Sequence, residues 1–172
     1  LTDECLSSDE LNARVSYAWR RLDLPSSWHA SEMGLEQGDD AELLFHERFA
    51  GLPDDARLRP AQKAAVDVAL QMDEPGLIII EAPMGNGKTE ASLLCAEILA
   101  RRFCDGGIAY LLPTMATSNA MFARVEGWLV RLAQSCGAPT QSMQLLHSKA
   151  VLNPDYARLK QWRSSWMGDG KE

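Results

Sequence analysis

The fold of this chain is decided by residues 77–89, which read Leu77-Ile78-Ile79-Ile80-Glu81-Ala82-Pro83-Met84-Gly85-Asn86-Gly87-Lys88-Thr89. The first four side chains are apolar and mostly β-branched, without polar alternation, which predicts a strand buried on both faces of a parallel sheet. After the loop, apolar residues recur at helical spacing from position 91 to position 99. A glycine-bearing loop between a strand and a helix is a usual site for binding polyphosphates.

Residues 82–89 fit the phosphate-binding pattern G-x-x-x-x-G-K-[ST], with Ala82 in place of the first glycine. Gly85 and Gly87 stand where a Cβ would keep the backbone away from a phosphate. We expect Lys88 to contact the β- and γ-phosphates of ATP and the Thr89 hydroxyl to bind Mg²⁺. The predicted nucleotide-binding residues of the loop are Pro83, Met84, Gly85, Asn86, Gly87, Lys88, Thr89 and Glu90.

Strand-like and helical segments alternate on both sides of this loop. Residues 108–112 and 143–146 resemble further strands, and residues 60–72, 117–132 and 155–166 carry apolar stripes at helical spacing. This order predicts an α/β fold in which right-handed crossovers connect a parallel sheet. We place this domain at 59–172, behind a short, mostly helical lead-in segment at 1–58.

The charge of the chain is unevenly distributed. Residues 1–58 carry 13 acidic and 5 basic side chains, whereas residues 59–172 carry 11 and 12. The net charge of −7 argues against a protein that coats nucleic acid by charge alone, so any nucleic-acid site must be local. We expect a cytoplasmic protein with no membrane association, because no apolar run approaches about 20 residues and no leader is recognisable.

Metal-ligating side chains are scattered. The four cysteines, Cys5, Cys95, Cys104 and Cys136, form no CxxC pair, which fits neither a disulfide framework nor a zinc cluster. The histidines stand alone at positions 29, 46 and 147. Thr89 is therefore the one metal-binding residue that we predict.

Two further stretches resemble motifs of superfamily 2 helicases. Arg59-Pro60-Ala61-Gln62 is similar to their adenine-recognition element, in which the glutamine amide pairs with the base; alone, Gln62 could equally be a surface glutamine. Residues 112–119, Leu-Pro-Thr-Met-Ala-Thr-Ser-Asn, look like the loop that contacts the backbone of single-stranded nucleic acid, where hydroxyls and amides donate to phosphates. The alternative is an ordinary turn before a helix capped by Thr117.

Together with Leu145-Leu146-His147-Ser148-Lys149-Ala150, these motifs resemble the CRISPR-associated helicase-nuclease of type I interference systems over residues 59 to about 150. The resemblance implies the first RecA-like motor domain, a three-layer sandwich that binds ATP and single-stranded DNA and acts with a Cascade-type surveillance complex against foreign DNA. It assigns Arg59 and Gln62 to the nucleotide. It assigns to the nucleic acid Pro113, Thr114, Thr117, Ser118, Asn119, His147 and Lys149.

The sequence also departs from that family. No Asp-Glu pair follows an apolar run after Lys88, and the clustered His and Asp ligands of a nuclease are not found. We therefore expect no complete catalytic set, with weak ATP binding and negligible turnover by these residues alone. Two alternatives remain: a non-catalytic interaction module that docks a partner through the acidic residues 1–58, and a nucleoside kinase, against which the helicase-like motifs argue.

Overall fold

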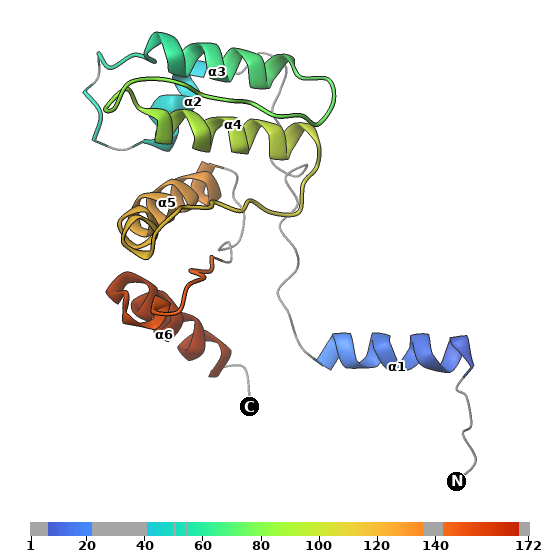
Figure 1. Ribbon diagram of the computed structural model, residues 1–172. Coiled ribbons are helices and arrows are strands. Elements are labelled where there is room, and N and C mark those ends of the chain that lie inside the picture. Colours follow the sequence, from blue (N-terminus) through green and yellow to red (C-terminus); the bar gives the residue numbers. More distant parts are fainter. Residues whose placement is uncertain (1–6, 22–40, 50, 54, 136–142, 169–172) are drawn as a thin grey trace.

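A computed structural model describes residues 7–21, 41–49, 51–53, 55–135 and 143–168, with backbone only for residues 19, 20 and 162–168. These residues form six α-helices and one short 3-10 helix, which Figure 1 labels. The elements are α1 Ser8–Arg21, α2 Ala41–Arg48, α3 Pro60–Gln71, α4 Lys88–Arg102, α5 Met115–Ser135, η2 Ala150–Leu152 and α6 Pro154–Gly168. None of these helices is both long enough and apolar enough to cross a membrane.

The predicted α/β fold, a RecA-like three-layer sandwich with a parallel sheet, is wrong for the described residues, none of which forms a strand. Residues 77–80, 108–112 and 143–146 run without regular structure, and within the described chain no backbone hydrogen bond joins these segments. Leu77 and Ile79 are 83% and 73% exposed, whereas Ile78 and Ile80 pack against the core. Only one side of the segment is covered, whereas a parallel strand needs both faces covered and a neighbouring strand.

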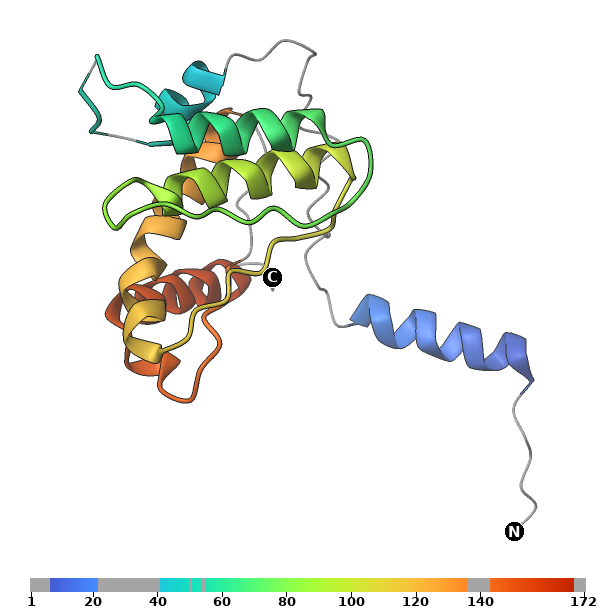
Figure 2. The ribbon, with the colours of Figure 1, turned by 45° about the horizontal axis from the view of Figure 1, so that its top comes forward.

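The main core lies between α3 and α4, which run side by side in both ribbon views (Figures 1 and 2). Pro60 occupies the first turn of α3, where its missing N–H costs nothing. Alanines on α3 let α4 approach closely, and Leu94 and Ile98 of α4 are fully buried. Leu44 and Leu58, from the predicted lead-in segment, belong to the same core. The predicted boundary at residue 58 stays a prediction, and side chains on both sides of it pack together.

Helix α5 connects two smaller cores. Near its C-terminal end, Trp128 and Leu132 pack with Leu93 of α4. Nearer its N-terminal end, Phe122 packs edge-on against Tyr156 of α6. Figure 2 shows α5 passing from the α3–α4 pair towards α6. One helix therefore holds the two parts of the structure together.

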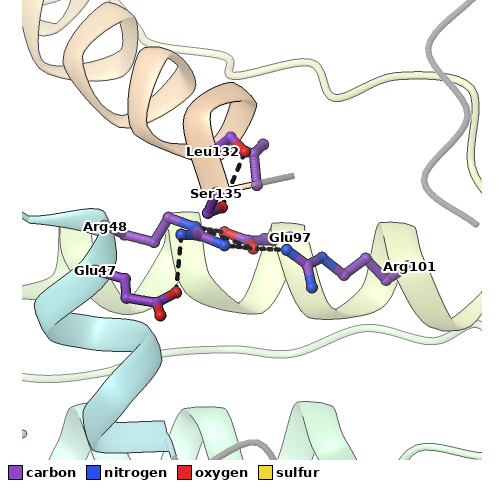
Figure 3. A network of polar contacts seen from close by, with 6 residues as sticks. All are labelled: Glu47, Arg48, Glu97, Arg101, Leu132 and Ser135. Carbon is purple, nitrogen blue, oxygen red and sulfur yellow. Dashed lines mark hydrogen bonds and ion pairs between the residues drawn. The ribbon is translucent and has the colours of Figure 1, made fainter. Parts of the chain in front are cut away.

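A buried ionic cluster ties α2 to α4 (Figure 3). Arg48 of α2 donates from Nε to Oε2 and from Nη2 to Oε1 of Glu97, both at 2.9 Å. Arg101 of α4 donates from Nη2 to Glu97 Oε1 at 2.5 Å. The side chains of Arg48, Glu97 and Arg101 are 2%, 0% and 6% exposed. Arg48 also pairs with Glu47 of its own helix, at 3.3 Å. The cluster holds α2 at one position along α4, because both guanidinium groups must meet the Glu97 carboxylate.

Helix α1 lies within the lead-in segment at 1–58, which was predicted to be mostly helical. Figure 1 draws it apart from the other helices, and its described side chains are exposed, among them Leu11 at 52% and Val15 at 60%. Leu11 and Val15 are therefore not covered by any described residue.

Candidate functional site

The glycine loop before α4 adopts the backbone shape that the pattern requires. Gly85 has a φ of 80° and Gly87 a φ of 73°, both in the left-handed region that glycine adopts without strain. Gly87 is the N-cap of α4, which begins at Lys88. The first amides of a helix have no partner within it, and the helix dipole favours an anion at this end. The loop thus offers backbone donors to an anionic ligand.

Lys88 lies folded over its own loop. Its ammonium donates to the carbonyl oxygens of Ala82 at 2.5 Å and Pro83 at 3.0 Å. The Asn86 N–H also donates to the Pro83 oxygen, at 3.4 Å, which closes the turn. The ammonium must leave these carbonyls before it can contact a phosphate.

Arg59 and Gln62, the predicted adenine-recognition residues, contact this loop although about 25 residues separate them from it in the sequence. Gln62 accepts the Arg59 N–H on Oε1 at 2.9 Å and donates from Nε2 to the Gly87 oxygen at 3.0 Å. The Arg59 guanidinium donates to the Gly85 oxygen. Gln62 is only 4% exposed and both ends of its amide are engaged by backbone, so base recognition by Gln62 stays a prediction.

A side chain at Gly87 would collide with this arrangement. A Cβ built there would lie 2.1 Å from Gln62 Nε2, which is far inside van der Waals contact. Gly85 has nothing within 4 Å of the same point. Gly87 therefore gives Gln62 the space that it needs to hold the loop.

A groove of about 970 Å³ opens beside the loop, between α2, α4 and α5; we name it the loop groove. Met84, Gly85, Gly87, Lys88, Thr89 and Glu90 line one side of it, and Phe49, Leu52 and Pro53 form an apolar wall. The basic side chains along it include Arg57, Arg59, Lys88, Arg124 and Arg131. This excess of positive charge favours a polyphosphate.

Of the basic residues outside the loop, Arg59 was predicted, whereas Arg57, Arg124 and Arg131 were missed from the sequence. Arg124 of α5 forms an ion pair with Glu90 of α4, although 34 residues separate them. Arg124 and Arg131 stand seven residues apart, which places them on one face of a helix, and this spacing was the available signal. Among the described residues, no group of three His, Cys, Asp or Glu could hold a metal ion. Thr89 lines the groove, and its hydroxyl is the type of ligand that Mg²⁺ accepts beside phosphates.

The predicted nucleic-acid loop leads into α5, whose cap is not Thr117. The helix begins at Met115, and the Thr117 N–H donates to the Thr114 hydroxyl at 3.2 Å. Thr117 and Ser118 donate their hydroxyls back to the Thr114 carbonyl, both at 2.9 Å. Pro113, Thr114 and Thr117 are exposed and Ser118 is half-buried. The loop is thus accessible, with its hydroxyls satisfied locally.

The structure brings Asn119 and His147 together across 28 residues. His147 Nδ1 accepts the Lys149 N–H at 3.2 Å, so Nε2 carries the proton and donates to Asn119 Oδ1 at 3.1 Å. Asn153 Nδ2 donates to the same oxygen at 3.0 Å. Lys149 is exposed, and no described residue accepts a hydrogen bond from its ammonium. Sequence reasoning missed Asn153, whose position before Pro154 marks a helix start but not its partner.

No family model matches the chain, and no solved structure matches it. It is 36% identical over 132 residues to the CRISPR-associated nuclease/helicase Cas3 of Streptococcus thermophilus, covering 77% of this chain and 14% of the relative.

It is also 39% identical over 115 residues to the CRISPR-associated endonuclease/helicase Cas3 of Thermus thermophilus, covering 67% and 12%. Over 86 residues it is 48% identical to the Cas3 protein of Escherichia coli, covering 50% and 9%. The matches thus span at most about a seventh of the relatives' length. The chain belongs to the CRISPR-associated Cas3 nuclease/helicase family, of whose members it matches a short segment.

Proposed function

We propose that this chain is an ATP-binding segment of an ATP-dependent helicase or translocase that acts on single-stranded DNA in CRISPR interference against foreign DNA. The observation that carries the proposal is the glycine loop, which Arg59 and Gln62 hold against the start of α4 inside a basic groove. The Cas3 relatives support the helicase context by their names.

Three parts of the loop take part in nucleotide binding: the backbone amides after Gly87, the Lys88 ammonium and the Thr89 hydroxyl. The amides after Gly87 donate to the phosphates, and the Lys88 ammonium exchanges the Ala82 and Pro83 carbonyls for phosphate oxygens. Thr89 holds Mg²⁺, which neutralises the charge of the phosphates. Arg124 and Arg59 add positive charge along the groove.

Hydrolysis by these residues alone is negligible in this proposal. Positioning the attacking water or holding the metal requires a carboxylate besides the loop. The acidic side chain that lines the loop groove is Glu90, and its carboxylate is already paired with Arg124. Binding without turnover is the expected activity.

The nucleic-acid site is formed by the start of α5 and residues 147–149. Exposed Lys149 contributes charge and the Asn119 amide contributes a neutral donor, both of which suit phosphate oxygens. We extend the proposal to a Cascade-type surveillance complex as the partner, because the motifs of residues 59 to about 150 resemble the helicase-nuclease of type I interference systems.

The proposal is tested by calorimetric titration of the chain with ATP and Mg²⁺. We expect weak but measurable binding, which Lys88→Ala abolishes because the phosphates lose their one loop ammonium. The matched control is Lys63→Ala on α3, where the ammonium pairs with Asp67 on an exposed surface. Absence of ATP binding by the unchanged chain, or equal binding by Lys88→Ala, would refute the proposal and favour an interaction module instead.

A further inference from the structure

We infer that Asn153 is a positioning residue of the nucleic-acid site: it fixes the side-chain amide of Asn119 so that its NH₂ group is presented to a phosphate of the bound strand. The inference rests on the proposed function. It adds a residue to the site and a reason for the orientation of Asn119.

The orientation of the Asn119 amide is determined from two sides, each anchored on a backbone N–H. On one side, the Tyr156 N–H donates to Asn153 Oδ1 at 3.0 Å, which leaves the Asn153 NH₂ as the group that faces Asn119. On the other side, the Lys149 N–H occupies His147 Nδ1, which makes Nε2 the donor. A backbone N–H can only donate, so neither anchor can be reversed.

Asn119 Oδ1 thus accepts two hydrogen bonds, from His147 and from Asn153, and both lone pairs are used. Turning the amide by 180° would set its NH₂ against two donors. No described residue accepts a hydrogen bond from Asn119 Nδ2, and the side chain is only half-buried, next to Ser118 of the predicted nucleic-acid loop. The NH₂ group is therefore available to an external acceptor.

The hydrogen bonds that lead from Tyr156 through Asn153 to Asn119 are shielded from water at their Tyr156 end. Asn153 and Tyr156 are each 6% exposed. The Tyr156 ring packs edge-on against Phe122 of α5, and its hydroxyl donates to Gln144 at 2.8 Å. Because its surroundings are packed, Asn153 is held in one orientation and passes that orientation to Asn119.

The external acceptor is a phosphate oxygen of a nucleic-acid backbone. A neutral NH₂ donor suits a phosphate oxygen and carries no sequence information. Lys149, two residues from His147, supplies the charge that an amide lacks. Together, the Asn119 amide and Lys149 fix the position of the strand without distinguishing its bases.

The decisive variant is Asn153→Asp. An ionised Asp still accepts the Tyr156 N–H and is an equally good N-cap, but it is an acceptor only and cannot donate to Asn119. We expect the melting temperature to stay close to that of the unchanged chain. Affinity for a fluorescein-labelled oligothymidylate, measured by anisotropy, should fall about tenfold, because the freed amide no longer presents its NH₂ group.

Three further variants separate positioning from charge and from folding. Asn153→Ser is a neutral N-cap without an amide and should weaken binding like Asn153→Asp. Gln144→Glu keeps an acceptor for the Tyr156 hydroxyl and adds a negative charge near the same cluster, so it measures repulsion alone. Asn119→Ala should weaken binding by the same factor as Asn153→Asp, and the double variant should be no weaker, because both changes remove one contact.

The inference is overturned if Asn153→Asp and Asn153→Ser bind the oligonucleotide as tightly as Gln144→Glu while Asn119→Ala and Lys149→Ala bind weakly. It is also overturned if the losses of Asn119→Ala and Asn153→Asp add up in the double variant. If Asn119→Ala and Lys149→Ala both leave the affinity unchanged, the proposed nucleic-acid site itself fails, and the inference fails with it.

Discussion

The buried cluster around Glu97 yields the sharpest test of how α2 is held against the rest of the chain. Replacing Glu97 by Gln keeps the shape of the side chain and removes its charge. Two arginines, Arg48 and Arg101, donate to this carboxylate, and Glu97 is fully buried. Removing one partner of a buried ion pair costs about 3–5 kcal/mol, because the opposite charges stay buried and lose this carboxylate, although the ion pair of Arg48 with Glu47 remains.

Such a loss is a large part of the stability of an ordinary domain, which is about 5–15 kcal/mol. For a chain of this length it corresponds to a fall in melting temperature of roughly 6–20 °C. In the assay, circular dichroism monitors unfolding in urea. We expect the slope of the free energy of unfolding against urea concentration to be the same for the variant and the unchanged chain. Asp67→Asn is the control, because its exposed pair with Lys63 should contribute less than about 1 kcal/mol. Equal and small losses for both variants would show that the cluster does not hold α2.

Two further predictions concern the effect of a substitution at Gly87 and the reactivity of Cys95. Gly87→Ala should reduce the free energy of unfolding by about 1–3 kcal/mol in the same assay and weaken ATP binding, since a left-handed φ and a Cβ 2.1 Å from Gln62 act together. Gly85→Ala shares the positive φ but has open space, so a loss equal to that of Gly87→Ala would contradict the reasoning. Burial raises the pKa of Cys95 to about 11, so at pH 8 only about one thiol in a thousand is ionised. Iodoacetamide should label exposed Cys104 before Cys95, as read by peptide mass spectrometry, and Cys95 should react only as the pH approaches 11 or the chain unfolds. Equal labelling rates of these two cysteines at pH 8 would contradict the burial of Cys95.

The helices could be predicted from the sequence because their signals are local. Helix α3 starts at Pro60 as expected, and the stripe predicted after the loop includes Leu94 and Ile98, which are fully buried. The start of α5 was placed two residues late, because Thr114 and Thr117 are both acceptable caps and the choice depends on which hydroxyl reaches the free amide. Local patterns thus predicted the helices themselves better than their ends.

The sheet was predicted wrongly because apolar runs do not identify their partners. Residues 77–80 have the composition of a strand buried on both faces, yet Ile78 and Ile80 alone contact the helical core. An extended segment that packs on one side and a strand in a parallel sheet share the same residue types. Which of the two forms depends on contacts far along the chain.

The site was predictable where residues lie close in sequence and less so where the fold brings them together. The loop pattern located Gly87 and Lys88, and the resemblance added Gln62, which the structure places on the Gly87 carbonyl. Arg124 and Asn153 contact predicted site residues 34 positions away, and no local pattern indicates such pairs. Both contacts depend on how α5 packs against the rest of the chain, because Arg124 and Asn119 both lie on α5.

Helix α5 also has a mechanical consequence. Its 21 residues make a rod about 30 Å long, with Asn119 near one end, Arg124 near the middle and Leu132 near the other end. A rod that pivots by about 5° where Trp128 and Leu132 are packed moves its opposite end by roughly 2 Å. Any ligand that draws Arg124 away from Glu90 therefore acts on a lever whose opposite end carries Asn119 and its hydrogen bonds to His147 and Asn153.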